Sequence, residues 1–155
     1  MTKSFFIITL VLIAFSCKKE TKNTPSEFIN TLENSPEVIT VGNNSLSLGM
    51  YLNRDFMPIC EEDGRPLFCI AELKNSLNLD LNETIQLKKI YVIDGEKVWS
   101  KAITETNMSF TAVTGMAADG PKWGPDIDVD VVCEFVYNGT LRRIIAKNQH
   151  IEMTI

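Results

Sequence analysis

Histidine is the scarcest chemically active residue in this chain, whose 155 residues contain only His150. One histidine cannot complete a Cys/His zinc set by itself, and no two cysteines have the CxxC spacing of such sites. The sequence also lacks a serine in a G-x-S-x-G elbow, a dinucleotide-binding G-x-G-x-x-G and a P-loop. These absences remove the common signatures of hydrolases, nucleotide-binding enzymes and zinc domains, and we predict no cofactor and no metal.

Positive charge is also scarce. Lys and Arg number 15 against 20 Asp and Glu, which gives a formal net charge of −5. Proteins that bind nucleic acids neutralise phosphates with clustered Lys and Arg, so this balance argues against a nucleic-acid partner. Mild acidity is compatible with a soluble domain beside a membrane surface.

Long apolar runs are absent. The longest run, residues 5–15, has Thr9 as its only polar member, and it is shorter than the roughly 20 residues of a membrane-spanning helix. Lys3 precedes the run, and Ser16 and Cys17 close it. A positive residue, a short apolar stretch and a small residue at the cleavage point are the parts of a secretory signal.

With Cys17 at that point, the N-terminus resembles the lipobox of bacterial lipoprotein precursors, although Ala14 stands where those families prefer Leu. The resemblance implies that residues 1–16 are removed and that Cys17 is lipidated on sulfur, so the partner of this segment is a membrane. Lys18 and Lys19 do not resemble the inner-membrane retention signal built on Asp. We therefore expect the bacterial cell envelope, at the outer rather than the inner membrane. An ordinary secretory signal or a short uncleaved anchor is the alternative.

Two further segments follow the predicted signal. Residues 17–36 are polar and rich in breakers, which predicts the lipidated cysteine and a flexible linker, with one helical turn after Ser26 as the alternative. Residues 37–155 alternate apolar and polar side chains between turn signals. We predict an all-β fold for this segment: an antiparallel β-sandwich of about seven or eight strands, with immunoglobulin-like character.

The clearest element of that domain is a hairpin around Asn138-Gly139, because both residues accept the backbone of a type I′ turn. Pairing outward from the turn sets Glu134 opposite Arg143 and Val132 opposite Ile145. These are favourable cross-strand neighbours.

Three cysteines, Cys60, Cys69 and Cys133, would travel with the domain to an oxidising compartment. Cys60 and Cys69 flank residues 61–66, the charged tip of a predicted hairpin. Strands paired around that tip would bring the two thiols within the separation of a disulfide, which we predict. A Cys69–Cys133 bond between two sheets, as an immunoglobulin-like resemblance implies, is the alternative.

Two turn-rich loops hold the candidate ligand-binding residues. Asp63 and Arg65 lie in one, and Asp119 and Trp123 lie in the other. Rigid sandwiches commonly present function on loops, and an aromatic ring in a stiff loop can stack on a sugar or anchor a protein. The alternative for Trp123 is a ring that folds back to cover the open end of the sandwich.

Asp126, Asp128 and Asp130 recur at every second position, so a strand places them on one face. Calcium needs oxygen ligands that converge on one point, whereas same-face residues of a strand stand about 6.5–7 Å apart. A solvated strand face is therefore the better interpretation. Together these patterns predict a non-catalytic envelope lipoprotein that binds an envelope protein or a glycan, or has a structural role. The alternative is a small envelope hydrolase or metal-dependent enzyme that uses the acidic cluster.

Overall fold

The computed structural model describes residues 25–60, 62–77, 81 and 84–155, which form one short helix and nine strands. The helix is α1 (Pro25–Glu33). The strands follow in chain order: β1 (Val38–Val41), β2 (Asn44–Asp55), β3 (Phe68–Asn75), β4 (Ile85–Asp94), β5 (Lys97–Ala102), β6 (Thr106–Met108), β7 (Ala112–Ala117), β8 (Asp128–Tyr137) and β9 (Thr140–Thr154). The predicted signal, with Cys17, lies outside the described residues.

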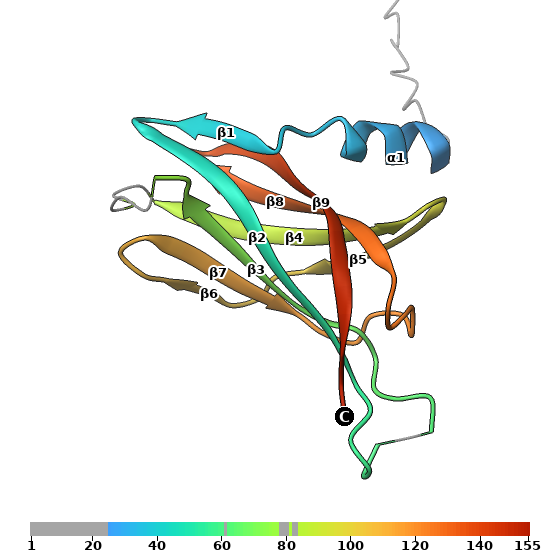
Figure 1. Cartoon of the computed structure of the whole chain (residues 1–155). Coiled ribbons are helices and arrows are strands. Elements are labelled where there is room, and N and C mark those ends of the chain that lie inside the picture. The colour runs from blue at the N-terminus through green and yellow to red at the C-terminus, as the bar shows by residue number, and fades with distance from the viewer. Residues whose placement is uncertain (1–24, 61, 78–80, 82–83) are drawn as a thin grey trace, which may run out of the picture.

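The strands form a single sheet that curls into half of a barrel (Figure 1). Its order is β5-β4-β8-β9-β2-β3-β7-β6, and β1 pairs with β2 off this path. The pairs are antiparallel except β2 with β9, which run parallel. β9 pairs with β8 along its first part and with β2 from Ile151 to Thr154, so it joins the two halves of the sheet.

The predicted all-β class is confirmed, whereas the immunoglobulin-like two-sheet sandwich is not, because β9 links both halves into one sheet. The hairpin at Asn138-Gly139 is present as β8–β9. Its register sets Glu134 opposite Arg143, as predicted, and Arg143 forms a 2.8 Å ion pair with that carboxylate. Strands β6 and β7 were not predicted, because residues 104–125 are rich in Thr, Asn, Gly and Pro, which favour turns.

The curl folds the inner faces of the two halves around one apolar core. Alternate residues of β2 point into it, beginning with Leu46 and Leu48 and reaching Leu52, all of them buried. The same alternation makes Arg54 the last inward residue of the strand, and it is only 3% exposed. A buried arginine thus stands where the apolar core ends.

Helix α1 covers the outer face of the β4–β8 side of the sheet (Figure 1). Phe28, Ile29 and Leu32 lie on one face of the helix, and Leu32 is fully buried. The ring of Phe28 meets Tyr91 of β4 edge-on, with centroids 5.7 Å apart. Helix α1 therefore lies inside the segment predicted as a linker, because this apolar stripe is buried against the sheet.

Candidate functional site

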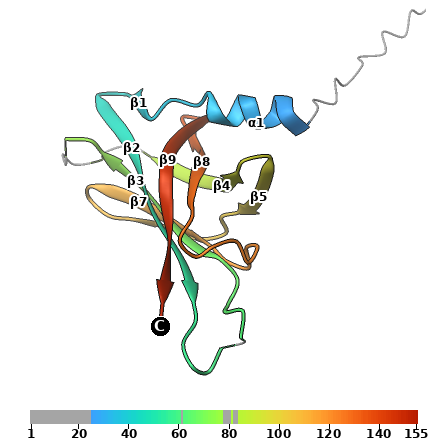
Figure 2. The same ribbon diagram turned by 45° about the vertical axis from the view of Figure 1, so that its right-hand side comes forward.

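Two loops that are far apart in the sequence meet at one end of the sheet. The β2–β3 loop, residues 56–67, extends from the end opposite α1 (Figure 2). The β7–β8 loop, residues 118–127, reaches it through a backbone hydrogen bond from the Gly120 N–H to the Leu67 carbonyl, 3.0 Å. These loops contain all four residues that the sequence singled out as ligand-binding candidates.

Arg54 holds the two loops together. Its Nε donates to the Arg65 carbonyl at 3.0 Å, and its Nη2 donates to the Asp63 carbonyl, both in the β2–β3 loop. Its Nη1 donates to the carbonyls of Lys122 at 3.2 Å and Gly124 at 2.7 Å, both in the β7–β8 loop. We call Arg54 with these four carbonyls the Arg54 clamp.

The Arg54 clamp supplies hydrogen-bond donors to carbonyls of the two loops. A carbonyl that points inward from a loop must find a donor, because a buried unpaired C=O costs free energy. The guanidinium carries five N–H donors in a fixed planar fork, so one side chain can satisfy several carbonyls. It also lies 4.8 Å from the centroid of the Phe56 ring. Gly64, at φ +69°, lies against that ring, where a Cβ would come within 2.7 Å of it.

An ion pair adds a second link between the loops. Lys122 Nζ lies 2.5 Å from Asp63 Oδ1. The hydrogen bond from Lys122 holds the pKa of the Asp63 carboxyl below its ordinary value, against a smaller opposing effect of desolvation. Both side chains are largely exposed, so this pair is a minor contributor beside the buried clamp.

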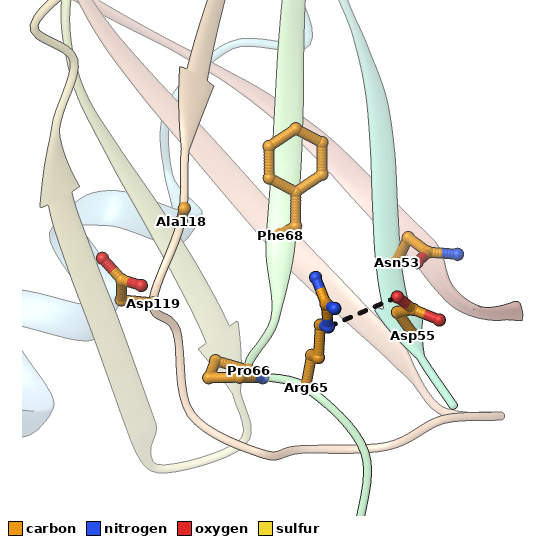
Figure 3. Close-up of a pocket in the computed structure, with 7 residues that line it drawn as sticks. All are labelled: Asn53, Asp55, Arg65, Pro66, Phe68, Ala118 and Asp119. Carbon is orange, nitrogen blue, oxygen red and sulfur yellow. Dashed lines mark ion pairs between the residues drawn. The ribbon is translucent and has the colours of Figure 1, made fainter. Parts of the chain in front are cut away.

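A hollow of about 380 Å³ opens beside the clamp, on the outer side of β2 and β3 (Figure 3). We call it the Arg65 hollow. Its lining comes from strand ends and both loops: Asn53, Asp55, Arg65, Pro66, Phe68, Ala118 and Asp119. Arg65 pairs with Asp55 at 3.5 Å, and its guanidinium lies below the Phe68 ring in this view. Asp119 forms the opposite wall and pairs with Lys101 at 3.3 Å.

Of the four candidates from the sequence, the structure brings Arg65 and Asp119 into this hollow. Asp63 lies in the same loop but pairs with Lys122 instead of lining the hollow. Trp123 is half-buried against the main core, with Lys97 Nζ 5.8 Å from its ring centroid. That position matches the alternative interpretation, in which this ring covers the end of the core.

Sequence reasoning missed Arg54, Asn53, Asp55 and Phe68. The signal for Arg54 was available, since alternation along β2 places it on the same face as Leu52. A single arginine at an inward position requires buried partners. Asn53, Asp55 and Phe68 read as ordinary outward residues, and only the pairing of β2 with β3 places them beside one another.

The predicted Cys60–Cys69 disulfide is absent from the structure, which leaves both thiols free. β2 and β3 stop pairing at Asn53 and Phe68, so Cys69 stands opposite Leu52 and Cys60 lies in the middle of a long loop. The alternative bond to Cys133 is also absent. Burial raises the pKa of the Cys69 and Cys133 thiols to about 12, so both are unreactive at neutral pH.

The acidic face of β8 holds the single histidine. His150 lies opposite Asp128 in the β8–β9 register, with Nδ1 2.9 Å from Asp128 Oδ1 and Nε2 3.6 Å from Asp126 Oδ1. Asp130 instead accepts a hydrogen bond from the Asn148 N–H. Within the described ranges, no group of three or more His, Cys, Asp and Glu side chains is arranged to hold a metal ion.

We expect His150 to titrate above its ordinary pKa of 6.5, because the hydrogen bond with Asp128 favours the charged ring. A raised folded-state pKa means that this contact stabilises the fold below pH 6.5 and that the contribution is lost as the pH rises through the folded pKa. NMR titration of the ring protons measures the pKa of His150 directly, since the chain has one histidine. Asp128→Asn should lower the pKa, and Asp94→Asn, on a distant turn, should leave it unchanged. A wild-type value at or below 6.5 would contradict the geometry.

Scans against protein-family models, curated proteins and solved structures found no match to this chain. Across the part of the chain that is described, none of the helices has the length and hydropathy to cross a membrane.

Proposed function

We propose that this chain is a lipoprotein of the bacterial cell envelope, anchored through Cys17, at the outer rather than the inner membrane. We propose further that its β domain binds a partner or ligand without catalysis, at the Arg65 hollow. The observation that carries the binding proposal is the Arg54 clamp, which holds two loops in one arrangement around a ready-made hollow with charged and apolar side chains in its lining. A pre-formed site does not lose the free energy of ordering its loops when a ligand binds.

The charged groups of the hollow are suited to binding a polar ligand. Asp55 and Asp119 each lie within 3.5 Å of a cationic nitrogen. A carboxylate in such a pair still offers lone pairs to a donor on a ligand. Binding residues are often found on loops that a rigid scaffold of strands holds in place.

The position of α1 supports a hollow that faces away from the membrane. Seven residues separate Cys17 from Pro25, and even a fully extended segment of that length spans only about 25 Å. Helix α1 therefore stays near the anchor, and the β2–β3 loop lies at the opposite end of the domain (Figure 2). In this arrangement the hollow is open to large molecules of the envelope.

A photo-crosslinking residue in place of Ala118 tests the proposal in the full chain, expressed in its native envelope. Ala118 is exposed and lines the hollow, so we expect a saturable adduct with one envelope component, identified by mass spectrometry. Thr140, exposed at the β8–β9 turn, is the matched control position and should give no such adduct. Absence of an adduct at Ala118, or the same adducts at both positions, would contradict binding at the hollow.

A further inference from the structure

The outer faces of the two halves of the sheet differ in how they are covered. Helix α1 packs on the β4–β8 side, whereas no helix among the described residues covers the outer face of β2, β3 and β7 (Figure 1). Three side chains form an apolar row across it, because the register pairs Tyr51 with Ile70 and Ile70 with Met116. Tyr51 is 42% exposed and Met116 is 47% exposed. We call this surface the outer β2–β3–β7 face.

A hollow lies on each side of this row. The Arg65 hollow is next to the pair Asn53 and Phe68. The second hollow, of about 310 Å³, is lined in part by Gly49, Glu72 and Lys74. Each is at the small end of the range of about 300–1,000 Å³ for ligand pockets. Gly49 lines one hollow and Asn53 the other, and four residues along a strand span about 13 Å, so a ligand that contacts both must be extended.

The charged residues that line the two hollows are all in ion pairs. Arg65 pairs with Asp55 at 3.5 Å, and Lys101 pairs with Asp119 at 3.3 Å. In the second hollow, Lys74 lies 3.8 Å from Glu72. Local charge is thus balanced, which gives no net attraction to a polyanion or a polycation. The paired groups still present N–H donors and carboxylate lone pairs to a ligand that has hydroxyls of its own.

A protein partner fits this face less well. The apolar row has only three side chains, of which Tyr51 is 42% and Met116 47% exposed, whereas a standard interface buries ~800 Å² per partner. Addition of a peptide strand is also excluded here, because β3 lies between β2 and β7 and has no free edge. A narrow apolar row with a hollow of mixed polar and apolar lining on each side matches a thin, extended ligand.

We propose, on the basis of the binding function above, that the outer β2–β3–β7 face binds an uncharged glycan chain of several sugar rings. Tyr51 and Phe68 lie along its path, and the negative face of an aromatic ring attracts the C–H groups of a sugar face. Asn53, Arg65 and Glu72 provide hydrogen bonds to hydroxyls at the two ends of the path. The ion pairs stay exposed and can rearrange around the ligand at little cost.

Titration calorimetry of the detergent-solubilised full chain with cellohexaose, chitohexaose and maltohexaose tests this proposal. We expect at least one of the three to bind. Tyr51→Ala and Phe68→Ala should each weaken that binding about tenfold, through loss of ring contact. Tyr51→Phe keeps the ring and should retain most of the affinity, which separates stacking from a folding defect. Phe110→Ala removes an 84% exposed ring from another surface and should change nothing.

Three results would overturn the glycan proposal. The first is that none of the three glycan chains binds. The second is that the affinity is unchanged in both Tyr51→Ala and Phe68→Ala. The third is that the protein forms a concentration-dependent dimer that Tyr51→Ala abolishes. A saturable protein adduct at Ala118 together with no glycan binding would refute the glycan and leave the proposed binding function intact. Glycan binding that Tyr51→Ala weakens and Phe68→Ala leaves unchanged, together with no adduct at Ala118, would refute binding at the Arg65 hollow alone.

Discussion

Replacing Arg54 with Met should lower the free energy of unfolding by about 3–5 kcal/mol. Methionine fills much of the same space but donates no hydrogen bond, so the four carbonyls of the Arg54 clamp lose their shared donor. Hydrogen bonds to charged groups contribute about 1.5–3 kcal/mol each, and partial relaxation of the loops recovers some of the loss. A loss of this size is a large share of the free energy of unfolding of a typical domain, about 5–15 kcal/mol.

Urea unfolding followed by circular dichroism measures this change. Arg142→Met is the matched control, because Arg142 is exposed on β9 and the substitution is chemically identical. Its effect should stay within about 0.5 kcal/mol. Equal losses in the two variants, or a loss below about 1 kcal/mol for Arg54→Met, would mean that the clamp does not hold the loops.

Replacing Cys17 with Ser should abolish incorporation of labelled fatty acid and release the domain from permanent membrane attachment. Acyl chains contribute about 0.8 kcal/mol per buried CH₂, and the lipobox resemblance implies several chains. A serine oxygen cannot form the thioether. Intact mass spectrometry of the wild-type protein should show a chain that begins at Cys17 and carries acyl groups.

Cys60→Ser is the matched control for that experiment, because it removes a loop thiol and leaves the N-terminus unchanged. It should incorporate the label as the wild type does. Retention of the label in Cys17→Ser, or a wild-type mass equal to that of the full 155-residue chain, would show that the lipobox interpretation is wrong.

Hairpins with short turns contain strong local sequence signals, and β8–β9 and β4–β5 are two examples. Asn138-Gly139 fixes both the turn type and the register of β8 with β9, which is why the Glu134–Arg143 pairing was predicted correctly. Asp94-Gly95 does the same for β4 and β5, where Asp94 pairs with Lys97. In both cases the interacting residues are neighbours in sequence, so the pattern contains the information.

Long-range pairing could not be predicted in the same way. The parallel contact of Leu52 with Ile151 joins distant segments, and neither segment contains a signal for the other. The same limit explains why the Cys60–Cys69 bond was predicted but is absent. The charged residues 61–66 indicated the tip of a tight hairpin, whereas β2 and β3 stop pairing at Asn53 and Phe68, well before that tip. The Arg65 hollow depends on long-range strand pairing and on the path of the β2–β3 loop. Single residues of the hollow could therefore be proposed from the sequence, but their proximity could not be predicted.

Amide hydrogen exchange at Gly120 is the most direct test of the central claim, which is that the two loops form one pre-arranged site. The Gly120 N–H donates to the Leu67 carbonyl at 3.0 Å, across the junction of the loops. We predict slow exchange of this amide in the wild-type chain and exchange at least tenfold faster in Arg54→Met, with Arg142→Met unchanged. Exchange of Gly120 at the rate of an unprotected amide in the wild-type chain would contradict the account.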